Sequence, residues 1–171
     1  MTTFAFPGRA AALALAAALS LSALPAFAHD FKVGDLIIDH PFSRATPPMA
    51  RVGAGYLTIT NTGATTDRLV SVACDCAKAA EIHEMKMDGN VMKMQQLPDG
   101  VAIPAGGSAA LAPGGNHLMF IGLKHGFVEG ETFQATLTFE KAGPVTVEFA
   151  IGPLRPMKGH GMPHKLDKSA N

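Results

Sequence analysis

The chain has 171 residues, and its 14 Lys and Arg residues balance 14 Asp and Glu residues, so the formal net charge at pH 7 is zero. A chain of this charge is not expected to bind nucleic acid or to dock electrostatically on an anionic membrane. There is no Trp and one Tyr, which argues against an aromatic stacking platform for bases or sugars, whereas Met is abundant with nine residues.

The first 28 residues have the features of an export signal. Arg9 supplies positive charge, an apolar run extends from residue 10 to about residue 24, and Ala26 and Ala28 form a small-residue cleavage site. The run is short for a spanning helix, and no later segment reaches spanning length. We therefore expect cleavage after residue 28, a periplasmic location and no stable membrane insertion. Retention as an uncleaved anchor is the alternative.

Residues 29–152 read as a series of short strands separated by Gly and Pro. In the segment 56–60, for example, polar and apolar residues alternate until a turn signal at residues 61–63. No segment of about 11 residues outside the leader has the 3.6-residue apolar period of a helix. This pattern predicts one all-β domain, a Greek-key sandwich or barrel. The expected strands lie at 36–38, 56–60, 69–73, 80–85, 91–97, 109–111, 117–123, 132–139 and 145–151.

Residues 153–171 differ in composition from the rest of the chain. They are rich in Pro, Gly and Lys and contain few residues suited to a core, so we expect a flexible extension. This tail also contains His and Met residues that form a secondary candidate metal site. They are Met157, His160, Met162 and His164.

The main candidate site combines His83, Met94, His117 and Met119. Residues two apart in a strand point to the same face, so His117 and Met119 can approach one ion from a single strand. The Asp88-Gly89-Asn90 turn favours a hairpin with His83 and Met94 on its two arms. Four donors from three strands are thereby expected to converge.

The types of donor in this set indicate the metal. Thioether sulfur is a soft, uncharged ligand that selects Cu(I), whereas zinc favours Cys or carboxylate and iron or manganese favours oxygen. A single Met is more often a core residue than a ligand, so the prediction rests on the combination. Met85 and Met87 share a face with His83, and Met92 shares one with Met94, so any of these three could line the site or replace Met94.

Several segments of the sequence resemble the PCu(A)C family of periplasmic copper chaperones. The matching segments are 53–61, 82–85, 91–94 and 113–119, and the resemblance extends over about residues 29–152. The family motif is a His, a Met after ten intervening residues, and a later His-x-Met. Here ten residues separate His83 from Met94, and 22 separate Met94 from His117, about one more than the family spacing. An insertion in the glycine-rich loop region between residues 106 and 115 is easily tolerated.

The resemblance implies a cupredoxin-like β-sandwich that binds Cu(I) and is not an enzyme. It implies delivery of copper to a copper-accepting protein of respiratory oxidase assembly, notably for the binuclear copper centre of cytochrome c oxidase. Members of the family often have a His- and Met-containing tail that resembles an auxiliary site, which suggests Cu(II) binding by residues 153–171. We expect the protein to act as a monomer.

Other functions share parts of this pattern. A copper buffer would use the same site without a dedicated client. A blue-copper electron carrier needs a Cys thiolate, and none accompanies His117 and Met119. An enzyme could use His29, exposed as a new amino terminus, together with His40 or His125, but no nucleophile–base signature or phosphate loop is present.

The sequence contains two cysteines, Cys74 and Cys76, on either side of Asp75. An oxidising compartment favours a disulfide, whereas free thiolates would be further ligands for Cu(I). These two alternatives stay open from the sequence.

Overall fold

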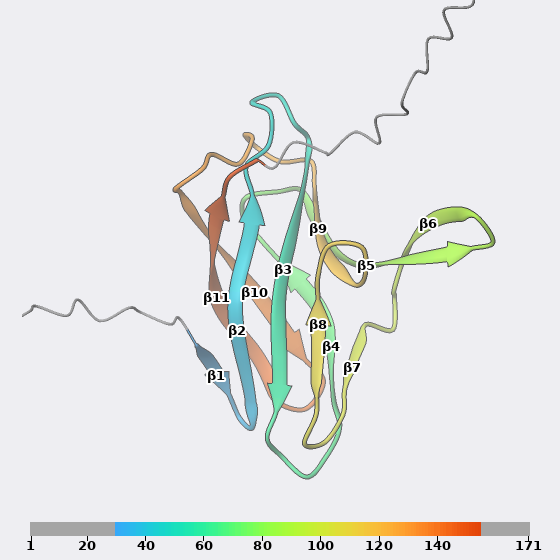
Figure 1. Ribbon diagram of the computed structural model, residues 1–171. Helices are drawn as coiled ribbons and strands as arrows, with labels where there is room; N and C mark the ends of the chain where they lie inside the picture. The colour runs from blue at the N-terminus through green and yellow to red at the C-terminus, as the bar shows by residue number, and fades with distance from the viewer. Residues whose placement is uncertain (1–29, 155–171) are drawn as a thin grey trace, which may run out of the picture.

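The computed structural model describes residues 30–154. Within this range there are eleven strands and no helix, so none that could span a membrane. The strands are β1 Phe31–Val33, β2 Leu36–Arg44, β3 Val52–Asn61, β4 Asp67–Ala73, β5 Ala79–Asp88, β6 Val91–Gln96, β7 Val101–Ile103, β8 Ser108–Leu111, β9 His117–Ile121, β10 Thr132–Phe139 and β11 Gly143–Gly152 (Figure 1).

The strands form one continuous hydrogen-bonded sheet. Its order is β6-β5-β9-β3-β2-β11-β10-β4-β7, with β1 paired to β2 and β8 paired to β3. All pairs are antiparallel except β11 with β2. The alternating burial along β3 and β10 shows that one face of each strand packs inward. The prediction of an all-β fold is therefore confirmed.

Aromatic side chains join the two halves of the sheet across the core. Phe120 of β9 meets Phe133 of β10 and Phe149 of β11 edge to face, with ring centroids 5.1 and 6.1 Å apart. Gly55 of β3 leaves room for these rings, because a Cβ atom there would lie 2.9 Å from Phe120 Cε2 and 3.1 Å from Phe149 Cε1. The ring packing and the small residue together fix where β9 lies beside β3.

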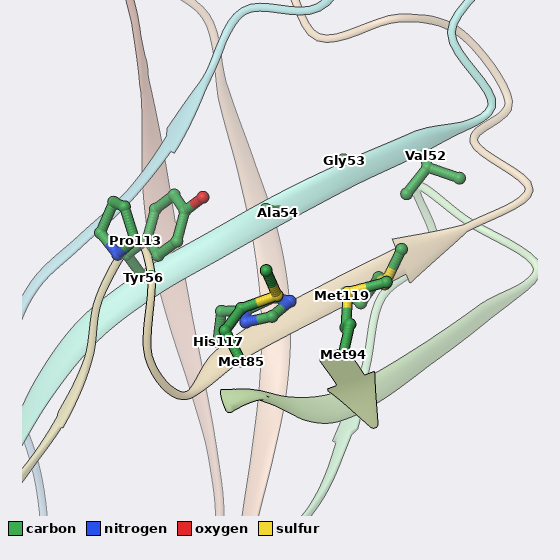
Figure 2. A pocket seen from close by; sticks show the side chains of 10 residues that line it. Val52, Gly53, Ala54, Tyr56, Met85, Met94, Pro113, His117 and Met119 are labelled. Carbon is green, nitrogen blue, oxygen red and sulfur yellow. The ribbon is translucent and has the colours of Figure 1, made fainter. Parts of the chain in front are cut away.

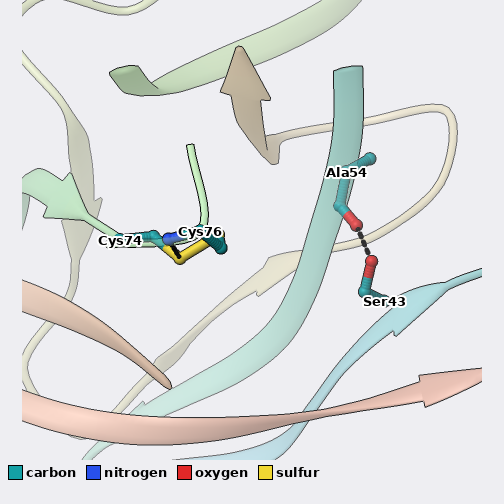
Figure 3. The surroundings of a disulfide bond; sticks show 4 residues. All are labelled: Ser43, Ala54, Cys74 and Cys76. Atoms are coloured by element: carbon teal, nitrogen blue, oxygen red, sulfur yellow. Dashed lines mark hydrogen bonds between the residues drawn. A yellow bond between two sulfur atoms is a disulfide. The ribbon is translucent and has the colours of Figure 1, made fainter. Parts of the chain in front are cut away.

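Side-chain hydrogen bonding also holds this region of the sheet together. The buried Ser43 hydroxyl on β2 donates to the Ala54 carbonyl on β3 at 2.6 Å (Figure 3). A disulfide joins Cys74 and Cys76 in the segment between β4 and β5 (Figure 3). The pair is therefore oxidised, which answers the question that the sequence left open.

Most strands lie where the sequence places them. Thr132–Phe139 has the predicted bounds, and each of the other eight predicted segments contains or overlaps an observed strand. Two strands of three residues each, β1 and β7, were not predicted, and the strand that begins at His117 ends at Ile121 rather than at residue 123. The leader and all tail residues from 155 onward lie outside the described range.

Candidate metal centre

Three adjacent strands carry the four residues of the main candidate site. His83 lies on β5, Met94 on β6, and His117 and Met119 on β9. The predicted hairpin is confirmed, because β5 ends at Asp88 and pairs with β6 in antiparallel register. Since β5 lies between β9 and β6, it brings the β9 pair and Met94 to the same end of the sheet.

The strand register puts the predicted donors on one face. His83 lies directly opposite His117 across β5 and β9, and Met85 lies directly opposite Met94 across β5 and β6. Direct partners in an antiparallel pair share a face, as do residues two apart. Met119 therefore shares this face with His117. The sequence predicts the shared face of each strand but not which residues lie opposite one another.

A pocket of about 290 Å³ opens on this face. Figure 2 shows His117 beside Met85, and Met119 near Met94, in the same pocket. Its lining comprises Val52, Gly53, Ala54, Tyr56, Met85, Met94, Pro113, Gly114, His117 and Met119. Three of the four main candidates thus line one cavity, and Met85, a secondary candidate, lines it with them.

His83 lies beside the pocket rather than in its wall. Its ring centroid is 5.9 Å from that of His117. Its Nε2 is 2.7 Å from Glu81 Oε2, and because an ionised carboxylate only accepts, Nε2 is the donor. A neutral imidazole then carries its lone pair on Nδ1, which is buried and has no hydrogen-bond partner among residues 30–154. Such an orphaned acceptor fits a position for a metal ion.

His117 shows the complementary arrangement. Its Nδ1 lies 3.0 Å from the Gly115 carbonyl oxygen, which can only accept, so Nδ1 carries the proton and Nε2 the lone pair. Metal-binding histidines characteristically donate from the second nitrogen to a carboxylate or a backbone carbonyl, which fixes the tautomer and the ring orientation. Both patterns are present here, with Glu81 and Gly115 as the acceptors.

Sequence reasoning missed the roles of Glu81 and Gly115. Glu81 is two residues before His83 and therefore on the same face of the strand, which is a signal that the sequence contains. The role of Gly115 depends on a backbone carbonyl and on the path of the loop before β9. The sequence has no comparable signal for it.

The donors range from buried to exposed. His117 is buried with 8% of its surface accessible, whereas Met94 is 48% exposed. A ligand set with its imidazole inside and a thioether at the rim leaves one side of a bound ion open to another protein. Neither cysteine lines the pocket.

A site built from three or more imidazole, thiolate or carboxylate ligands is not apparent in the part of the chain that the structure describes. Across residues 30–154, no group of three or more His, Cys, Asp or Glu side chains is arranged to hold a metal ion. The secondary candidate Met92 is exposed on β6 and does not line the pocket, and the four tail candidates lie outside the described residues.

A model of the family described as "Putative lipoprotein LpqE-like" matches residues 36–151. The chain belongs to this family. One relative is the putative lipoprotein Lxx21020 from Leifsonia xyli subsp. xyli, which is 34% identical over 96 residues. The match covers 55% of this chain and 58% of that relative, so the chain spans little more than half of the relative's length.

Solved structures of PCuAC domains share the fold of this LpqE-like protein. They confirm the resemblance to the PCu(A)C family and the expected cupredoxin-like fold. The apo PCuAC domain from PmoF1 is 31% identical, with a TM-score of 0.63 over 74% of this chain and 100% of that domain. The copper-bound PCuAC domain from PmoF2 is 26% identical, also with a TM-score of 0.63, over 74% and 99% of the two chains. The Cu(I) form of DR1885 from Deinococcus radiodurans is 28% identical, with a TM-score of 0.56 over 74% and 83%.

Proposed function

We propose that this protein binds one Cu(I) ion through His83, Met94, His117 and Met119 and passes it to another protein. The observation that carries the proposal is the complementary pair of histidines. One nitrogen of each ring is held by an acceptor, Glu81 or the Gly115 carbonyl, and the other nitrogen is left with its lone pair. Met94 and Met119 line the pocket beside them.

The donor set favours Cu(I) over other metals. Two imidazoles and two thioethers are neutral, and soft sulfur ligands select Cu(I). Zinc sites use thiolate, imidazole and carboxylate in groups of three or four, and no such group occurs among residues 30–154. The copper-bound domain from PmoF2 and the Cu(I) form of DR1885 support the same metal.

The exposure of the site suits transfer rather than storage. Met94 is half exposed at the rim, so a partner's ligand can replace it while the buried His117 still holds the ion. Stepwise ligand exchange of this kind needs no catalytic group, and we propose a chaperone without enzymatic activity. The match to a lipoprotein family and to the putative lipoprotein from Leifsonia xyli supports a cell-envelope location, for which we propose the periplasm.

The proposed acceptor is a protein of respiratory oxidase assembly, with the binuclear copper centre of cytochrome c oxidase as the destination. An electron-transfer role is less well supported, because blue-copper sites need a Cys thiolate and both cysteines are joined in a disulfide away from the pocket. A copper buffer would use the same residues without directed transfer.

A transfer experiment separates these functions. The protein is loaded with one equivalent of Cu(I) and mixed with the reduced, copper-free domain of an oxidase subunit that carries the binuclear centre. We expect copper to reach that domain faster from this protein than from a small-molecule chelator that binds Cu(I) with equal affinity. Equal rates from the two donors would identify the protein as a buffer, and absence of Cu(I) binding would refute both functions.

A further inference from the structure

The hairpin of β5 and β6 extends beyond the rest of the sheet. Strand β9 pairs with residues 79–83 of β5, so the remainder of β5 pairs with β6 alone. Strand β6 has no second partner among the described strands. Figure 1 shows the hairpin of β5 and β6 projecting away from the other strands.

The two faces of this hairpin have different chemistry. Met85 opposite Met94 and Met87 opposite Met92 form two successive cross-strand pairs on one face. The other face carries polar pairs, including a hydrogen bond of 2.7 Å from Gln95 to Glu84 and an ion pair between Lys93 and Asp88. The methionine face has no charged side chain between residues 84 and 95.

The outer pair has no role in packing. Met87 is 56% exposed and Met92 is 54% exposed, and neither belongs to the core or lines the pocket. Exposed apolar residues in a contiguous group usually mark an interaction site. The inner pair, in contrast, already lines the proposed copper pocket.

We propose that Met87 and Met92 form a second, outer Cu(I) site through which the ion enters and leaves the pocket. This inference rests on the proposed function of the main site. Opposite Cβ atoms in an antiparallel pair lie about 4.5–5.5 Å apart, and the flexible Met side chain lets both sulfurs reach one ion between them. Two thioethers leave the coordination incomplete, so the third ligand comes from a partner or from the inner pair.

The spacing of the two pairs supports stepwise movement. The inner and outer pairs are two residues apart along each strand, which corresponds to about 6.6 Å. Because the ion can exchange one thioether at a time, it does not have to leave the methionine face. The outer pair holds Cu(I) more weakly than the main site because it offers fewer donors and no imidazole.

The test uses the purified protein with its Met methyl groups labelled with ¹³C and titrated anaerobically with Cu(I). We expect the first equivalent to shift the pocket methyls and further Cu(I) to shift those of Met87 and Met92. The double variant Met87→Leu with Met92→Leu keeps the apolar area of the hairpin. We expect it to retain the tight equivalent, lose the weak one and release Cu(I) to a chelator about tenfold more slowly.

The matched control is Lys86→Gln with Lys93→Gln, on the opposite face of the same hairpin, which we expect to change neither binding nor release. Unmoved Met87 and Met92 methyls at excess Cu(I), or an unchanged release rate in the double Met variant, would overturn the outer site while leaving the main site standing. Absence of the tight equivalent from the unmodified protein overturns the proposed function instead, and the outer site is then decided by its methyl shifts alone.

Discussion

His83 lies directly opposite His117 across β5 and β9, and within residues 30–154 each ring has one hydrogen-bonded nitrogen and one nitrogen without a hydrogen bond. The acceptors are of different kinds, a carboxylate for His83 and a backbone carbonyl for His117. A substitution can remove the first acceptor but not the second. Glu81 is therefore the position at which the orientation of a proposed ligand can be tested without removing the ligand itself.

Replacement of Glu81 by Ala is expected to lower Cu(I) affinity by about 10- to 100-fold while one ion is still bound. The variant removes the acceptor that holds Nε2 of His83 and leaves that ring free to turn. Competition with a Cu(I)-specific chelator measures the change. Glu84→Ala is the matched control, since Glu84 is on the opposite face and bonds Gln95. An effect of the same size in both variants would contradict a positioning role for Glu81.

The two methionines that face each other in the hairpin are expected to differ. Met94→Leu removes a proposed ligand and is expected to weaken Cu(I) binding by more than about 100-fold, whereas Met85→Leu removes a neighbour and should have a smaller effect. Leucine preserves the apolar volume of the side chain. The control is Met49→Leu, because Met49 is 86% exposed and lies outside the pocket. If Met85→Leu is the more damaging change, Met85 rather than Met94 is the ligand.

Removal of both cysteines is expected to leave the copper site unchanged. Cys74 and Cys76 close a loop with one intervening residue, so the disulfide restricts the unfolded chain little and its loss should lower the free energy of unfolding by less than about 2 kcal/mol. Chemical denaturation and Cu(I) titration of Cys74→Ala with Cys76→Ala measure both quantities. A loss of the tight equivalent in this variant would show that the thiols take part in binding.

The prediction for pH concerns Asp67, which is buried near the start of β4. Burial alone would raise the pKa of this carboxyl, but backbone N–H groups of Lys141, Arg68 and Ala142 donate to it and the Lys141 charge lies nearby, so the net pKa is below the ordinary value of 3.8. A lowered folded-state pKa stabilises the protein fully above pH 3.8, and this stabilisation is lost as the pH falls through the lowered value.

Asp67→Asn is accordingly expected to lower the free energy of unfolding by about 1–3 kcal/mol at neutral pH, because the amide group turns a donor toward backbone donors. The difference from the unmodified protein should shrink as the pH falls below 3.8. Urea unfolding of both proteins, from neutral pH to below pH 3.8, measures this difference in stability. Asp99→Asn, at an exposed position, is the control. A difference that does not depend on pH would mean that the charge of Asp67 has no part in stability.

Much of the fold follows from local sequence patterns. Alternating residues and Gly-containing turns locate nine of the eleven strands, whereas β1 and β7 have three residues each, too few for a period to be visible. The sequence also locates the hairpin at Gly89. It does not specify register, which depends on packing such as that of Gly55 against Phe120 and Phe149.

The same distinction applies to the site. The spacing of His117 and Met119 places both on one face, as the structure has them. That Met85 faces Met94, and that His83 faces His117 rather than Met94, follows from the pairing of three strands and not from any one of them. Met85, which the sequence gives as a secondary candidate, lines the pocket together with Met94.

The most direct test of the copper site is a Cu(I) titration of the protein truncated after Leu154, alone and with His117→Ala and Met119→Ala combined. The truncation removes every candidate ligand in the tail and keeps the strands that carry the pocket. We predict one tight equivalent in the truncated protein and none in its double variant. Tight binding that disappears with the tail, or that survives the double substitution, would contradict the assignment of the site to His83, Met94, His117 and Met119.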